Sequence, residues 1–215
     1  MRQKEKHRVE SLAGLCRLDK RHTERATETL VNAFLGDPLY AALVPDRDQR
    51  RNFLWPLFRL RYRFGLRYGE VWAISPNVEG IAIWLPARKV KVSFLRLLCC
   101  GGFPLLFGWK GRIMRQLMGT LPALRPARDP VTPGDFMILA PVAVHPDHWG
   151  KGHASALIRP MLARLDSEGI PCWLATQSER DVSIYRHFGF QIAQQGLLPT
   201  ISLPYWTMER SAPAP

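Results

Sequence analysis

The first helices predicted by the hydrophobic pattern lie near the N-terminus. In TERATETLVNAFLGDP, apolar residues recur at helical spacing, Thr23 can cap the helix, and Gly36-Asp37-Pro38 ends it. A second helix is predicted over 47–69, where apolar and basic residues separate by face. Its Pro56 marks a kink or an early turn. These two segments predict a helical first quarter of the chain.

The rest of the pattern alternates between strands and helices. The run FMILAPVAV (136–144) predicts a buried strand, although Pro141 in its middle cannot donate to a strand ladder. Turn residues between 70–75 and 80–86 predict a hairpin. The later half indicates an α/β domain with a parallel strand pair. Strands are predicted over 70–75, 80–86, 136–144, 171–176, 190–195 and 205–210, and helices over 153–169 and 179–189.

The length of 215 residues suits one α/β domain with a full core. We expect a poorly ordered lead-in over 1–20, one domain over 21–210 with a variable insert at about 87–120, and a short tail over 211–215. A proline-rich surface linker over 122–135 separates the insert from the buried strand.

One apolar segment, Val92–Trp109, raises the question of membrane contact. Charged and helix-breaking residues interrupt it, which favours a buried helix-loop-helix over an integral membrane span. Surface attachment to anionic lipid remains open. The charged N-terminus lacks the apolar run of a signal peptide. The four cysteines form no CxxC pair and favour reduced thiols, so we expect a cytoplasmic protein.

The charge balance points to an anionic partner. Lys and Arg number 30 against 18 Asp and Glu, which gives a formal net charge of +12. Such a surface attracts nucleic acid, anionic lipid or a polyphosphate cofactor, although the charge can also serve solubility alone. Nucleic-acid or lipid binding by the basic helix at 47–67 stays an alternative function. The absence of a recognised nucleic-acid-reading motif argues against it.

A glycine-containing turn identifies the candidate ligand site. In VHPDHWGKGHASALI (144–158), Gly150 and Gly152 lie between an apolar strand and an apolar helix. Glycines let the backbone approach an anion closely, and the helix N-terminus offers free N–H groups. A P-loop is excluded because Lys151 precedes the second glycine and no Ser or Thr occupies the magnesium position. A Rossmann site fits poorly because only about sixty residues follow.

The same turn resembles the Q/R-x-x-G-x-G/A signature of the GNAT acyltransferases. The six positions run from Trp149 to Ala154, with Trp149 where the family has Gln or Arg. The segment SERDVSIYRHFGF resembles the family's N…Y…GF segment, with Ser178 at the asparagine and Tyr185 at the tyrosine. The likeness covers about residues 136–192 and is nearest to the puromycin N-acetyltransferases and their bacterial relatives.

This resemblance implies a mixed, mostly antiparallel sheet with a splayed central parallel pair, flanked by helices. It implies an N-acetyltransferase that moves the acetyl group of acetyl-CoA directly to a primary amine, and we expect that amine to belong to a small molecule. Tyr185 would protonate the departing thiolate. The residues that would contact the cofactor are Val142, Ala143, Val144, Trp149, Gly150, Lys151, Gly152, His153, Ala154, Ser155 and Ser178.

The general base is not assigned by the sequence. The central strand contains no carboxylate, and Ala175 stands where the puromycin enzymes have a glutamate. Water, Asp37 or Glu70 could take the proton. A metal is not expected, because no acid or cysteine accompanies the nearby histidines at ligand spacing. A catalytically degenerate acyl-CoA-binding protein is the other alternative function, and homodimer formation stays open.

Overall fold

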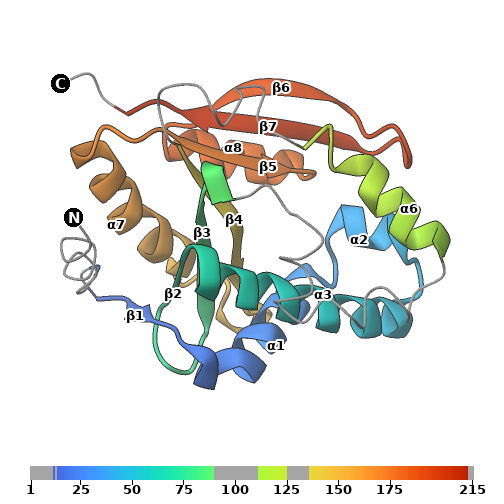
Figure 1. Ribbon diagram of the computed structural model, residues 1–215, viewed down its shortest axis with the longest axis horizontal. Coiled ribbons are helices and arrows are strands. Elements are labelled where there is room, and N and C mark those ends of the chain that lie inside the picture. The colour runs from blue at the N-terminus through green and yellow to red at the C-terminus, as the bar shows by residue number, and fades with distance from the viewer. Residues whose placement is uncertain (1–11, 13, 90–110, 125–135, 213–215) are drawn as a thin grey trace.

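The computed structural model describes residue 12 and residues 14–89, 111–124 and 136–212. Its centre is a seven-stranded sheet in the order β1-β2-β3-β4-β5-β7-β6 (Figure 1). The strands are β1 (Cys16–Arg17), β2 (Glu70–Ala73), β3 (Gly80–Pro86), β4 (Met137–Val144), β5 (Cys172–Thr176), β6 (Gln191–Leu197) and β7 (Pro204–Arg210). The α-helices are α1 (Thr23–Phe34), α2 (Pro38–Leu43), α3 (Arg47–Tyr68), α6 (Gly111–Thr120), α7 (His153–Ser167) and α8 (Glu179–His187).

The sheet is antiparallel except between its central strands. β4 and β5 run parallel and are paired only at Met137 with Cys172 and at Ile138 with Trp173. Beyond Ile138, β4 keeps its pairing with β3 up to Val144 but has no register with β5. The expected mixed sheet with a splayed central parallel pair is therefore confirmed. Pro141, which lacks an N–H, lies in the part of β4 that does not pair with β5.

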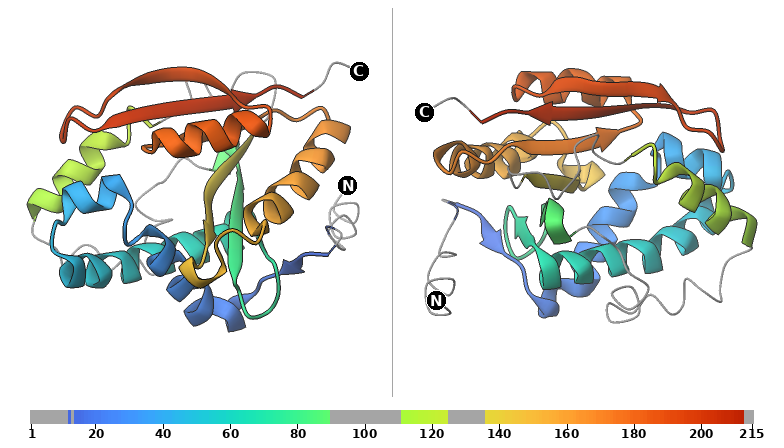
Figure 2. Two further views of the ribbon diagram at one scale, coloured as in Figure 1. Left: turned by 180° about the vertical axis from the view of Figure 1, so that it is seen from behind. Right: turned by 45° about the horizontal axis from the view of Figure 1, so that its top comes forward.

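Helices cover both faces of this sheet and divide the core in two. Figure 2, seen from behind, shows α7 and α8 on one face, with β4 passing between them. Leu157, Met161 and Leu165 of α7 pack there with Trp84 and Phe190. The opposite face is covered by α1, α2 and α3, whose apolar residues form a separate cluster with the sheet. We call the first the back face and the second the front face.

Two short elements were not predicted. Cys16–Arg17 forms β1, which pairs with β2 and belongs to the fold, where we expected a poorly ordered lead-in over 1–20. Pro38–Leu43 forms α2, where we expected only the end of a helix, because the Asp37 side chain accepts hydrogen bonds from the N–H groups of Leu39 and Tyr40. The proline then occupies the first helical turn, where its missing N–H costs nothing.

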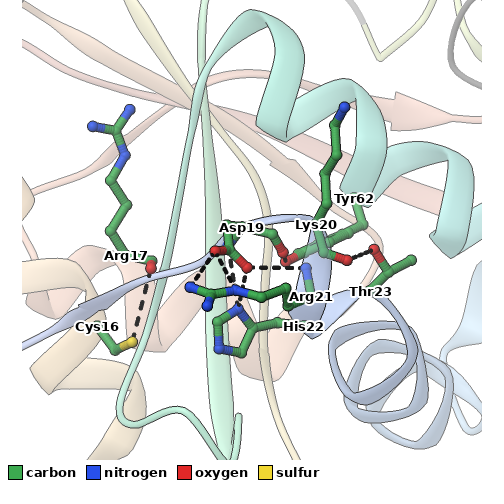
Figure 3. Close-up of polar contacts among 8 residues, drawn as sticks. All are labelled: Cys16, Arg17, Asp19, Lys20, Arg21, His22, Thr23 and Tyr62. Atoms are coloured by element: carbon green, nitrogen blue, oxygen red, sulfur yellow. Dashed lines mark hydrogen bonds and ion pairs between the residues drawn. The ribbon is translucent and has the colours of Figure 1, made fainter.

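The cap of the first helix also differs from the prediction. Thr23 is the first residue of α1, and its hydroxyl donates to the Lys20 carbonyl and caps nothing. Asp19 instead caps the short 3-10 helix η1 (Lys20–His22), accepting from the Arg21 N–H at 2.9 Å (Figure 3). The Tyr62 hydroxyl donates to the Asp19 carbonyl at 2.7 Å and so ties this entry turn to α3.

Part of the predicted insert and linker lies outside the described residues. This holds for all of 92–109, for the linker beyond 124 and for the end of the tail. Across the stretches that are described, no helix combines the length and apolar character needed to cross a bilayer.

α3 continues unbroken past Pro56, in agreement with the predicted span of 47–69 to within one residue.

Candidate active site

A pocket opens on the back face where β4 and β5 part. It has a volume of about 130 Å³ and lies between the end of β4, the first turns of α7 and the middle of α8. Five residues predicted from the sequence meet there, although they are up to 43 positions apart: Val142, Ala143, Val144, Ala154 and Tyr185. Ile158, Asp181 and Ile184, which were not predicted, complete its lining.

The glycine turn beside this pocket has the geometry of an anion site. Gly150 and Gly152 both have φ of 76°, a conformation that L-residues other than glycine rarely adopt. A Cβ placed on either glycine would meet no protein atom within 4 Å. Gly152 is the N-cap of α7 and provides no side-chain hydrogen bond, so no capping side chain covers the first N–H groups of the helix. These residues fit a pyrophosphate group.

The side chains of the turn lie around this opening. The Trp149 indole is 60% exposed and its N–H donates to the Val144 carbonyl at 2.8 Å. The Lys151 ammonium group donates to the Asp147 carbonyl at 3.3 Å. His153 and Ser155, in the first turn of α7, are half-buried. Trp149 thus stabilises the turn through the backbone at the position where the family signature has Gln or Arg.

The end of β4 directs backbone groups toward the splay. The His145 N–H donates to the Glu79 carbonyl, which follows the turn before β3, at 2.8 Å. Because successive residues of a strand alternate in direction, the backbone groups of Val144 point to the other side, toward β5. There they are available to an extended ligand, except that the Val144 carbonyl already accepts from Trp149.

Tyr185 projects from α8 into the same pocket. Its ring contacts Phe190 edge-on, with 5.9 Å between centroids, and it packs against the back-face core. Burial is the main reason that the pKa of its hydroxyl is raised, and the Asp181 carboxylate raises it further. Within the described residues the hydroxyl has no hydrogen-bond partner, which leaves it free for a ligand.

Asp181 is one helical turn before Tyr185 on α8 and was missed by the sequence analysis. Its carboxylate lies 3.4 Å from the Thr176 hydroxyl, which donates to it. Burial is the main cause of the raised pKa of this group. The spacing of four residues from Tyr185 was the signal that could have identified it, since side chains four apart share one helix face.

Ser178 has a structural task in this region. It is the N-cap of α8, and its hydroxyl oxygen accepts from the Asp181 N–H at 3.3 Å. Ser178 does not line the pocket. Its predicted contact with the cofactor therefore stays a prediction.

The front face provides a second carboxylate. Asp37, the N-cap of α2, accepts from the Leu39 N–H at 2.9 Å and the Tyr40 N–H at 3.3 Å. Burial raises its pKa to about 6, with a further contribution from Asp181, while these two hydrogen bonds and Arg61 act in the opposite direction. The charge of Asp181 is the last of the contributions that raise the pKa of Asp37.

Glu70, the other carboxylate named as a base candidate, is already bound. Both of its carboxylate oxygens accept from the Arg164 guanidinium, at 2.8 and 3.0 Å. The Trp72 indole N–H donates to the same carboxylate at 2.9 Å. With these partners Glu70 joins β2 to α7, and we exclude it as the base.

A buried arginine fixes the segment that carries Asp37. Arg50 of α3 is only 9% exposed and donates to three backbone carbonyls. These belong to Leu35, just after α1, and to Val44 and Pro45, just after α2, at 2.8, 2.9 and 2.6 Å. The arginine thus holds both ends of the segment that contains Asp37.

The three histidines near the turn lie side by side. Ring centroids are 6.2 Å apart for His145 and His148, and 6.0 Å for His148 and His153. The His145 ring is also 2.9 Å from the Asn32 amide on α1. Across the described ranges, no three His, Cys, Asp or Glu side chains are grouped so that they could hold a metal ion.

Comparison with known proteins shows which family the chain resembles. Residues 104–190 match the acetyltransferase (GNAT) family. The chain is 25% identical over 190 residues to an uncharacterized N-acetyltransferase of Schizosaccharomyces pombe, a match that covers 86% of this chain and 76% of the relative. These findings support a GNAT-family acetyltransferase.

Solved structures share the fold. A structure described as histone acetyltransferase HPA2 and related acetyltransferase, from Corynebacterium glutamicum, superposes with a TM-score of 0.64 at 20% identity, covering 94% of this chain and 97% of the other. Arylalkylamine N-acetyltransferase 2 of Aedes aegypti gives a TM-score of 0.65 at 12% identity, covering 93% and 98%. At these identities the likeness concerns the fold.

Proposed function

We propose that this protein is an acetyl-CoA-dependent N-acetyltransferase that acetylates a primary amine of a small molecule. The observation that carries the proposal is the pocket at the β4–β5 splay. It brings Val142–Val144 and Tyr185 together next to an uncapped helix N-terminus preceded by two glycines with positive φ. A backbone edge, an anion site and a hydroxyl are what binding of a pyrophosphate-linked thioester requires.

Acetyl-CoA binding is assigned to the turn and the end of β4. The N–H groups at the start of α7 would receive the pyrophosphate, and the positive end of the helix dipole favours its charge. The exposed Lys151 adds a positive charge at the same end. Val142–Val144 would pair with the pantetheine arm as a neighbouring strand would, in the space that β5 leaves. Backbone N–H groups there would also stabilise the oxyanion that forms on attack.

Tyr185 is assigned the protonation of the leaving thiolate. Its hydroxyl has no protein partner among the described residues and faces the pocket that the thioester would enter. Burial raises its pKa and makes it a weaker acid than a free phenol. The same surroundings disfavour the thiolate of coenzyme A and raise the pKa of its thiol as well. The pKa values of the proton donor, Tyr185, and of the acceptor, the thiolate, therefore remain matched.

Asp37 is assigned the role of general base on the front face. With a pKa of about 6 it is ionised at neutral pH and still basic enough to accept a proton from an amine. Asp37 belongs to the front-face layer, so in this proposal the amine approaches the thioester from the front face. Arg50 fixes the segment on which Asp37 lies.

The charge of the chain supports a small amine over a basic peptide. A protein with a net charge of +12 attracts the polyanionic coenzyme and repels a lysine-rich chain. The Aedes aegypti relative is named for arylalkylamines, and the resemblance noted in the sequence suggests puromycin. We therefore propose small amines with an aromatic part as the first acceptors to examine.

The experiment is a thiol-release assay with acetyl-CoA and four acceptors: tyramine, puromycin, spermidine and a lysine-containing peptide. We expect release of coenzyme A above the amine-free rate with tyramine or puromycin, and mass spectrometry should show the acetylated amine. Binding of acetyl-CoA without acetylation of any acceptor would contradict the transferase and favour an acyl-CoA-binding protein without catalysis.

A further inference from the structure

The carboxylate of Asp181 has no place in the chemistry described above, although it lines the donor pocket. We propose that Asp181 selects the acyl group: it admits neutral acyl chains and excludes acyl chains that end in a carboxylate, such as succinyl and malonyl. This inference rests on the proposed function, because it assumes that the pocket at the splay receives an acyl-CoA.

The surroundings of Asp181 make its charge effective. Apart from Tyr185, the residues that line the pocket with it are aliphatic: Val142, Ala143, Val144, Ala154, Ile158 and Ile184. The Thr176 hydroxyl donates to the Asp181 carboxylate, and Ser178 and the charge of the exposed Arg180 also favour its ionised form, but none of these three residues lines the pocket. A charge in such surroundings is screened much less than one on the surface.

A second carboxylate strengthens the effect. Asp37 interacts electrostatically with Asp181 from the front face. Burial raises the pKa of both groups, the direction expected where a negative charge is poorly solvated. An acidic acyl chain would bring another carboxylate close to Asp181, whereas an acetyl or butyryl chain adds no charge.

Long-range and local charge therefore act in opposite directions. The net charge of +12 attracts every acyl-CoA, because all of them carry the same phosphates. Discrimination among acyl groups needs a local negative charge beside the acyl chain. Asp181 is the charged side chain among the described residues that line this pocket.

Asp181 could instead serve only the helix. It lies in the first turn of α8, where an acid interacts favourably with the helix dipole. Glu179 lies in the same turn but is exposed and does not line the pocket. Asp181→Asn and Glu179→Gln therefore remove the same charge from the same turn, and only the first removes it from the pocket.

The experiment measures dissociation constants by calorimetry for acetyl-CoA, butyryl-CoA and succinyl-CoA. Butyryl and succinyl chains have four carbons each, so their comparison isolates the terminal carboxylate. We expect the wild-type protein to bind butyryl-CoA about 30-fold more tightly than succinyl-CoA, a ratio expected for like charges in a poorly screened pocket. In Asp181→Asn, the ratio should fall to about 5 or less, because succinyl-CoA binds more tightly.

Each remaining outcome contradicts the inference. A wild-type ratio near one would show that the pocket does not select by charge. An equal ratio in wild type and Asp181→Asn would place the selection elsewhere, and an equal fall in Glu179→Gln would assign it to the helix dipole. A folded wild-type protein that binds none of the three thioesters would contradict the donor site itself, and the inference with it.

Discussion

The two faces of the sheet place their functional groups in different ways. On the back face, the pocket is formed by residues from two segments, 142–158 and 181–185, and the turn at Gly150 and Gly152 offers its backbone. On the front face, Asp37 depends on contacts among three helices, including the three hydrogen bonds of Arg50. A site made by the backbone tolerates an altered side chain such as Trp149, whereas a site made by side chains does not.

The largest effect is expected on the back face from Tyr185→Phe, which removes the proposed acid and little else. We expect kcat to fall roughly 10²- to 10⁴-fold, the usual contribution of a positioned general acid. The dissociation constant of acetyl-CoA, measured by calorimetry, should change by about twofold or less, because the backbone makes the donor site.

Tyr62→Phe is the matched control for this variant. It removes the hydrogen bond of the Tyr62 hydroxyl to the Asp19 carbonyl, far along the chain from the pocket. We expect a loss of about 1 kcal/mol in the free energy of unfolding and an unchanged kcat. Equal loss of kcat in the two variants would show that Tyr185 acts only through stability.

On the front face, Asp37→Asn should lower kcat/KM about 100-fold near neutral pH. The wild-type profile of kcat/KM against pH should fall on the acid side with a pKa of about 6, the value for Asp37. The variant should lose this limb, while asparagine keeps the cap of α2. A limb that persists in Asp37→Asn would assign the base to another group.

The same variant should be more stable than wild type at neutral pH. The pKa of Asp37 is raised in the folded state, so the folded protein holds the proton more tightly between pH 4 and 6 and wild-type stability falls as pH rises through that window. Above pH 6, Asp37→Asn should gain roughly 1 to 2 kcal/mol in the free energy of unfolding, measured by chemical denaturation. The gain should vanish near pH 4.

A smaller effect is expected from Gly152→Ala on the back face. The new Cβ would meet no protein atom, but it would occupy the space proposed for the pyrophosphate. We expect the dissociation constant of acetyl-CoA to rise about 30-fold, the loss of one or two hydrogen bonds to a charged group. This dissociation constant is measured by calorimetry.

Gly169→Ala separates this effect from backbone strain. Gly169 follows the other end of α7, has φ of 68°, and likewise has no atom within 4 Å of a Cβ. The Gly169→Ala variant should have similar backbone strain, and its dissociation constant for acetyl-CoA should equal that of the wild type. A similar loss of affinity in both variants would contradict binding of the pyrophosphate at the glycine turn.

Sequence reasoning succeeded for the parts of the fold that depend on local patterns. The glycine turn, Tyr185 and the strand that contains Pro141 are each recognisable within a short stretch. Tyr185 lines one pocket with the end of that strand, and the roles assigned to these residues stay predictions. The splayed parallel pair itself was expected from the family resemblance, and the structure confirms it.

The sequence did not reveal what depends on distant partners. Glu70 looked available as a base because nothing nearby in the chain showed Arg164, which lies 94 positions away, binding it. The raised pKa of Asp37 comes from burial and from Asp181, 144 positions later. β1 and α2, with two and six residues, were too short for hydrophobic periodicity to indicate them.

The measurement that tests the central claim most directly is a calorimetric titration of the wild-type protein with acetyl-CoA, with ATP and NAD titrated under the same conditions. We predict a single site with a micromolar dissociation constant for acetyl-CoA and much weaker binding of the two nucleotides. A folded protein that does not bind acetyl-CoA, or that binds ATP or NAD equally well, would contradict a donor site at the splay of β4 and β5.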